Sequence, residues 1–165
     1  MKNKGVVEPS FFALFPKRIL IFIRSLKTKF PKKIVKIPVD SNEYLARFVI
    51  FSKWIRSSDK TVKPDAFIPH PYEELSVTRH LYPNNLSEEE LWAIGQDVAN
   101  SRNATLYGRA DIRTITVRQQ NLDVIPKQVV GNPNHANVIN WPNDKALQKS
   151  IAQKLAAGAQ YIPKP

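Results

Sequence analysis

The chain has 165 residues, of which 42% are hydrophobic, and these values fit one globular domain with a real core. It contains no cysteine, which excludes disulfides, thiolate zinc sites, Fe–S clusters and cysteine nucleophiles. The formal net charge is +11, and residues 1–40 carry +8 of it, with ten Lys and Arg against two acidic residues. This asymmetry predicts a basic arm over residues 1–40 with an anionic partner, followed by a single domain over residues 41–165.

The first predicted element is an amphipathic helix in this arm. Pro16 and Pro31 bracket residues 17–30, and the apolar side chains of that segment gather mostly on one helical face. Its cations suit phosphate contacts of the kind that nucleic acid offers. Lysines outnumber arginines, so we expect weak sequence specificity. The candidate nucleic-acid-binding residues are Lys17, Arg18, Arg24, Lys27, Lys29, Lys32, Lys33 and Lys36.

The same arm has two other interpretations. A basic helix with an aromatic and aliphatic face can lie in the headgroup region of a membrane surface. It can also dock on its own domain or on a protein partner, with its lysines in solvent. The apolar runs at residues 11–15 and 19–23 are too short for a signal peptide or a membrane span, which needs about 20 apolar residues. We therefore expect no transmembrane segment and a cytoplasmic location, which a cysteine-free chain suits.

Beyond the arm, periodicity and turn residues predict an α+β domain. The clearest local signal is Ser87 followed three residues later by Glu90, the pattern of a capping box at a helix start. We expect a small, mostly antiparallel sheet with about three packed helices. The predicted helices lie near residues 43–54, 88–101 and 144–157, and the predicted strands near residues 75–80, 109–118 and 122–130. Residues 135–141 form either a further strand or a structured loop.

Four segments of this domain, taken in order, resemble a group of short bacterial proteins with no established activity. They are SVTR at 76–79, LWAIG at 91–95, LYGRAD at 106–111 and HANVINWP at 135–142. The resemblance extends over residues 44–162 and implies a bacterial origin. It draws attention to five polar residues but assigns them no role: Arg79, Arg109, Asp111, His135 and Asn137.

A catalytic hypothesis follows from some of the same residue types. His80 and His135 could act as general acid and base, because histidine titrates near neutral pH. Arg79 and Arg109 could clamp a phosphate, with Asp111 beside them. Such a set would suit metal-independent cleavage of RNA or other phosphate chemistry if the side chains converge. The alternative is structural: an Arg–Asp pair across strands and a histidine that satisfies turn carbonyls.

Motifs for other chemistries are missing from the sequence. The five glycines are isolated, so there is no phosphate-binding loop, and no serine lies in a nucleophile elbow. With only three histidines and no cysteine, a dedicated metal site is not expected, and neither is a cofactor. Trp141 and Asn137 are the predicted contacts to a protein partner. The leading prediction is a small accessory protein whose arm contacts nucleic acid and whose body binds a protein, and its enzymatic status stays open.

Overall fold

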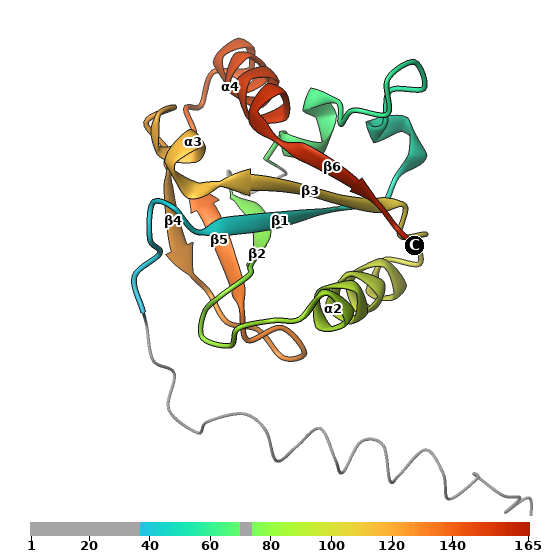
Figure 1. Cartoon of the computed structure of the whole chain (residues 1–165). Helices are drawn as coiled ribbons and strands as arrows, with labels where there is room; N and C mark the ends of the chain where they lie inside the picture. The colour runs from blue at the N-terminus through green and yellow to red at the C-terminus, as the bar shows by residue number, and fades with distance from the viewer. Residues whose placement is uncertain (1–36, 70–73) are drawn as a thin grey trace, which may run out of the picture. The chain divides into compact units, whose positions relative to one another are not determined.

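The computed structural model describes residues 37–69 and 74–165 (Figure 1). The helix predicted over residues 17–30 and all eight candidate nucleic-acid-binding residues, from Lys17 to Lys36, lie outside the described residues. They therefore remain predictions from sequence.

The described residues form an α+β structure built on a six-stranded antiparallel sheet, which confirms the predicted fold class. The strand order is β4-β5-β2-β1-β3-β6. The strands are β1 (Tyr44–Val49), β2 (Leu75–Arg79), β3 (Gly108–Arg113), β4 (Asp123–Pro126), β5 (His135–Ile139) and β6 (Gln160–Pro163). The helices are α2 (Glu88–Ser101), α3 (Thr114–Arg118) and α4 (Lys145–Gly158), with short 3-10 turns η1 (Ser52–Trp54) and η2 (Pro64–Phe67).

Helices cover both faces of this sheet, with α4 on one side and α2 on the other (Figure 1). Successive side chains of a strand point to opposite faces. Leu45 and Val49 of β1 accordingly lie in the larger core, on the α4 and η2 side. Ala46 and Phe48 lie in a smaller core with Leu91 of α2. Strand β1 is therefore buried on both faces.

This double burial explains why the helix predicted near residues 43–54 is wrong. The segment forms β1, which pairs with β2 on one side and β3 on the other. Apolar residues at positions 45, 48 and 49 match a helical stripe, but a strand buried on both faces also lacks clean alternation. Hydrophobic periodicity alone does not separate these two cases.

Two other predicted strands are shorter in the structure. The strand predicted over residues 109–118 ends at Arg113, where α3 begins. The backbone N–H groups of Thr114 and Ile115 donate to the carbonyl oxygens of Glu43 and Ser41, at 2.9 and 2.8 Å, and this helps to fix the turn into α3. The strand predicted over residues 122–130 ends at Pro126, although the backbone N–H of Lys127 still donates to the carbonyl oxygen of His135 at 2.9 Å. Strand β6 was not predicted.

The predicted helices near 88–101 and 144–157 are confirmed as α2 and α4. The capping box of α2 is complete, since Ser87 Oγ accepts from Glu90 N and Glu90 Oε2 accepts from Ser87 N. Asp144 caps α4 by accepting from the backbone N–H of Leu147. Leu147 itself is exposed, although the spacing predicts it on the core face with Leu155, which is fully buried. Within residues 37–69 and 74–165, no helix has the length and apolar character needed to span a bilayer.

Candidate functional site

The five residues of the catalytic hypothesis lie on two faces of the sheet. Arg79 pairs in register with Leu45, so its side chain points to the α4 side. Arg109 and Asp111 pair with Phe48 and Ala46 and point to the α2 side. His135 pairs with Thr78, which also faces α2. The structure therefore does not bring Arg79 together with the other four residues.

Arg79 forms a closed structural clamp. Its Nε and Nη2 donate to the two carboxylate oxygens of Glu43 at 2.9 and 2.8 Å, and both side chains are almost fully buried. Its Nη1 and Nη2 also donate to the carbonyl oxygens of Ile37 and Pro38. These bonds tie the chain before β1 to the end of β2. All three nitrogens of the guanidinium are engaged within the protein, so Arg79 is not available to a substrate phosphate.

Arg109 belongs to a second hydrogen-bonded network. This network joins side chains on the α2 side of β3 to the first turn of α2. The Nε of Arg109 lies 3.0 Å from Asp111 Oδ2, and its Nη1 and Nη2 donate to Glu88 at 2.7 and 2.8 Å. The guanidinium also stacks over the Trp92 ring, at 4.7 Å from the centroid. Burial lowers the pKa of Arg109, but the Glu88 and Asp111 carboxylates outweigh it and raise that pKa above its ordinary value. The hydrogen bond from Arg109 lowers the pKa of Glu88.

His80 lies beside this network. Its Nε2 is 3.4 Å from Asp111 Oδ1, and the buried Nε2 atom has no hydrogen-bond partner among the described residues. The structure thus brings His80, Arg109 and Asp111 together and adds Glu88 to them. In the sequence, Glu88 stands out only as part of an acidic first turn of a helix, which the helix dipole already explains.

His135 has different partners. Its Nδ1 is 2.6 Å from the carbonyl oxygen of Lys127, just after β4, whereas Nε2 of His80 is directed toward Asp111 of β3. Burial is the main cause that lowers the pKa of His135. The two histidines therefore share no partner. A general acid and a general base that act on one bond must both reach it, and this arrangement does not bring them to a common group.

The two predicted partner contacts, Trp141 and Asn137, are both buried. Trp141 is 5% exposed, lies in the larger core and donates from Nε1 to the carbonyl oxygen of Val138. Asn137 is 4% exposed and donates from Nδ2 to Glu74 Oε2. Neither side chain is available to a partner in this structure. The indole of Trp141 folds back onto β5 through its hydrogen bond to Val138.

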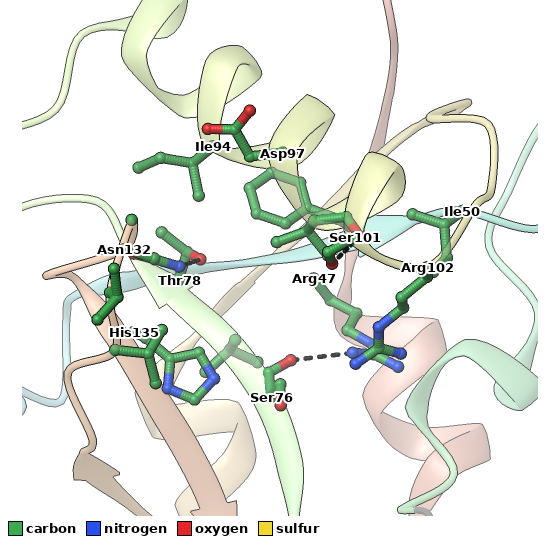
Figure 2. A pocket seen from close by; sticks show the side chains of 16 residues that line it. Arg47, Ile50, Ser76, Thr78, Ile94, Asp97, Ser101, Arg102, Asn132 and His135 are labelled. Carbon is green, nitrogen blue, oxygen red and sulfur yellow. Dashed lines mark hydrogen bonds between the residues drawn. The ribbon is translucent and has the colours of Figure 1, made fainter. Parts of the chain in front are cut away.

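A cleft of about 250 Å³ lies between α2, the sheet and the chain after β4 (Figure 2). Its apolar wall comes from Phe48 and Ile50 of the β1 segment and from Ile94 and Val98 of α2. It adjoins a second hollow of about 680 Å³, whose walls include the aromatic rings of Phe51 and Trp54. The two hollows share three residues: Arg47, Ser76 and Arg102.

Arg47 and Arg102 meet where these two hollows join. Arg47 donates from Nε to the carbonyl oxygen of Ala66 at 2.8 Å and from Nη1 to that of Ser76 at 3.1 Å. Its guanidinium lies 5.4 Å from the centre of the Trp54 ring. Burial, with a further contribution from the charge of Arg102, lowers the pKa of Arg47 to about 10. Among the ion pairs of the described residues, none includes Arg47 or Arg102.

The sequence did not single out this arginine pair. Arg47 stood in a segment predicted as helix, where a charged residue has an exposed face available to it. Arg102 marked only the predicted end of α2. Their meeting depends on β1 being a strand beside the last turn of α2, which periodicity did not reveal. Within the described parts of the chain, no group of His, Asp and Glu is arranged to hold a metal ion.

No protein-family model matches the chain, and no curated protein or solved structure is significantly similar to it. The resemblance of residues 44–162 to a group of bacterial proteins therefore stays a prediction.

Proposed function

We propose that this chain is a non-catalytic accessory protein that contacts nucleic acid through its basic arm. The observation that carries the proposal is the charge of residues 1–40, which hold ten Lys and Arg against Glu8 and Asp40. Each phosphate contact made by a lysine or arginine releases condensed counterions, so such an arm binds nucleic acid strongly at low salt. With few arginines, it would bind with weak sequence specificity.

The geometry of the domain supports a binding role over catalysis. A site that cleaves phosphodiesters needs cations free to hold phosphate and two groups placed to transfer protons. Arg79 donates to Glu43 and to backbone carbonyls, and Arg109 donates to Glu88 and Asp111. These pairings leave neither guanidinium free to hold a substrate.

The same proposal gives the domain a protein partner. Val129 and Val130 lie in the connection between β4 and β5, and Val130 is fully exposed. Two adjacent exposed valines beside a cleft suit contact with another protein, since exposed apolar patches commonly mark such interfaces. They replace Trp141 and Asn137 as candidates for this contact.

The arm is tested by oligonucleotide binding across a salt series. We would compare the full chain with a variant carrying Lys27→Gln, Lys29→Gln and Lys33→Gln. The matched control replaces three exposed lysines of the domain: Lys60, Lys149 and Lys154. The arm variant should weaken binding to single- and double-stranded oligonucleotides and reduce the slope of log affinity against log salt by about 2–3. The control variant should change the slope much less.

Three other results would contradict the proposal. If neither variant changes the slope, the arm does not contact phosphates. Cleavage of the oligonucleotide that is lost in His80→Gln would instead favour the catalytic hypothesis. Binding to vesicles of anionic lipid, with no binding to oligonucleotides, would favour the membrane-surface alternative.

A further inference from the structure

Arg47 and Arg102 form a pair of neighbouring like charges with no carboxylate partner among the described residues, which is an unfavourable arrangement. Burial is the main cause that lowers the pKa of Arg47, and the charge of Arg102, which lines the same two hollows, lowers it further. Buried charges are normally paired, as Arg79 and Arg109 are in this same domain. Among the described residues Arg47 has two carbonyl oxygens and the Trp54 ring as partners but no carboxylate, and an anion is the group that would neutralise the pair.

Both guanidiniums have hydrogen-bonding capacity to offer. Nη2 of Arg47 has no hydrogen bond to the described residues, and the Arg102 side chain has none either. Figure 2 shows the Arg102 side chain extending toward the guanidinium of Arg47, beside Ser76 at one end of the cleft. A guanidinium fork matches the oxygen atoms of a phosphate or carboxylate and donates to two of them at once.

The walls next to the arginine pair limit the rest of the ligand. Phe48, Ile94 and Val98 give the cleft an apolar wall, and its volume of about 250 Å³ suits a small organic group. An apolar group attached to the anion would be removed from water there, which adds to the binding free energy. Inorganic anions lack such a group and would use only the arginines.

Acidic residues around the two hollows argue against a long polyanion. Asp97 lines the cleft, and Asp65 and Glu74 line the adjoining hollow. Glu74 is already paired with Lys127 at 2.7 Å, and Asp97 points away from the arginine pair in Figure 2. A strand of nucleic acid would bring several phosphates near these carboxylates, whereas a ligand with one anionic group would not.

We propose that the cleft between α2 and the sheet binds a small organic oxyanion. Its phosphate or carboxylate lies between Arg47 and Arg102, and its apolar part packs against Phe48, Ile94 and Val98. This proposal does not depend on the proposed contact with nucleic acid.

Calorimetric titration of the full chain with phenyl phosphate, benzoate and uncharged phenol tests this site. The key variant is Arg102→Gln, because Arg102 is exposed and its replacement should leave the fold intact. The matched control is Arg56→Gln, a second exposed arginine, which lines neither hollow. We expect Arg102→Gln to weaken binding of the preferred anion by about tenfold or more, since charged hydrogen bonds contribute that much to affinity. Arg56→Gln should bind as the unchanged chain does.

Each outcome of this titration either identifies the anionic group of the ligand or contradicts the proposed site. Preference for phenyl phosphate identifies the anionic group as a phosphate, and preference for benzoate identifies it as a carboxylate. Equal weakening in both variants would show a general charge effect and overturn the site. So would binding of phenol as tight as that of the anions, or no binding at millimolar concentrations. All of these results leave the salt-dependent binding of oligonucleotides by the arm unaffected, so the two proposals fail separately.

Discussion

Two arginines on neighbouring strands of the same sheet differ in whether carboxylates pair with them. Arg109 of β3 is surrounded by carboxylates, with Asp111 on its own strand and Glu88 on α2. Arg47 of β1 lies where the cleft under α2 joins the adjoining hollow, with two carbonyl groups as hydrogen-bond partners and a second arginine nearby. Arg109 is paired with carboxylates of the protein, whereas Arg47 is not. This difference distinguishes a structural network at Arg109 from a candidate binding site at Arg47.

The arginines that are paired with carboxylates predict an order of stability losses when those carboxylates are replaced. Breaking a buried ion pair leaves an uncompensated charge in the interior, and its cost grows with the burial of the partner that remains. Pairs with an exposed member contribute less because water and salt screen them.

The largest loss is expected for Glu43→Gln, which leaves the buried guanidinium of Arg79 without its counter-charge. Both side chains are at most 2% exposed. We expect the free energy of unfolding to fall by about 3–5 kcal/mol, measured by urea denaturation. A loss under about 1 kcal/mol would mean that the carbonyls of Ile37 and Pro38 suffice for Arg79.

Asp111→Asn should have an intermediate effect. The Asp111 side chain is 8% exposed and accepts from Arg109 Nε, while Glu88 still holds the rest of that guanidinium. We expect a loss of about 1.5–3 kcal/mol in urea denaturation, the range for a hydrogen bond to a charged group. Asp123→Asn, which breaks a more exposed pair with Arg118, is the matched control and should cost less. Equal losses would contradict the ordering by burial.

Glu88→Gln should cost about 0.5–1 kcal/mol, because the Glu88 side chain is 62% exposed. The effect should depend on pH. Arg109 holds the pKa of Glu88 below its ordinary value, so the ionised carboxylate favours the folded state. That contribution is complete above the ordinary carboxyl pKa and is lost as pH falls through the lowered one. The difference between the variant and the unchanged chain should therefore be constant near pH 7 and shrink below about pH 4.

A difference that persists unchanged at pH 3, well below the ordinary pKa of a glutamic acid, would show that Glu88 acts through packing. Thermal unfolding of both proteins between neutral and acid pH gives this comparison directly.

The smallest change is expected for Arg102→Gln in the absence of any added anion. Removing one of two like charges relieves repulsion on Arg47, so the melting temperature should stay constant or rise slightly. Every paired arginine should show the opposite sign. A clear fall in melting temperature would mean that Arg102 has a stabilising partner, and it would weaken the case for a binding site.

Local signals in the sequence predicted part of this structure. Ser87 and Glu90 fixed the start of α2, since a capping box depends only on residues close together in the chain. Strand β2 and helix α4 followed from periodicity. The same reasoning failed at β1, because burial on both faces depends on which elements pack there. It also failed at β6, a short edge strand whose pairing with β3 is set by distant residues.

In the candidate sites, too, contacts between residues close together in the chain were predictable and contacts between distant residues were not. The pairing of Arg109 with Asp111 was foreseeable as a structural alternative, because residues two apart on a strand share a face. The partners Glu43 of Arg79 and Glu88 of Arg109 are 36 and 21 residues away in the chain. The Arg47 and Arg102 pair needed both the correct assignment of β1 and the position of α2, so sequence patterns could not indicate it.

The contrast between the two kinds of arginine is tested most directly by NMR of the arginine Nε–H groups during titration with the preferred oxyanion. The account predicts that the signals of Arg47 and Arg102 shift and saturate together, while those of Arg79 and Arg109 stay in place because carboxylates already hold them. Saturable shifts at Arg79 or Arg109, or the absence of any saturable shift at Arg47, would contradict it.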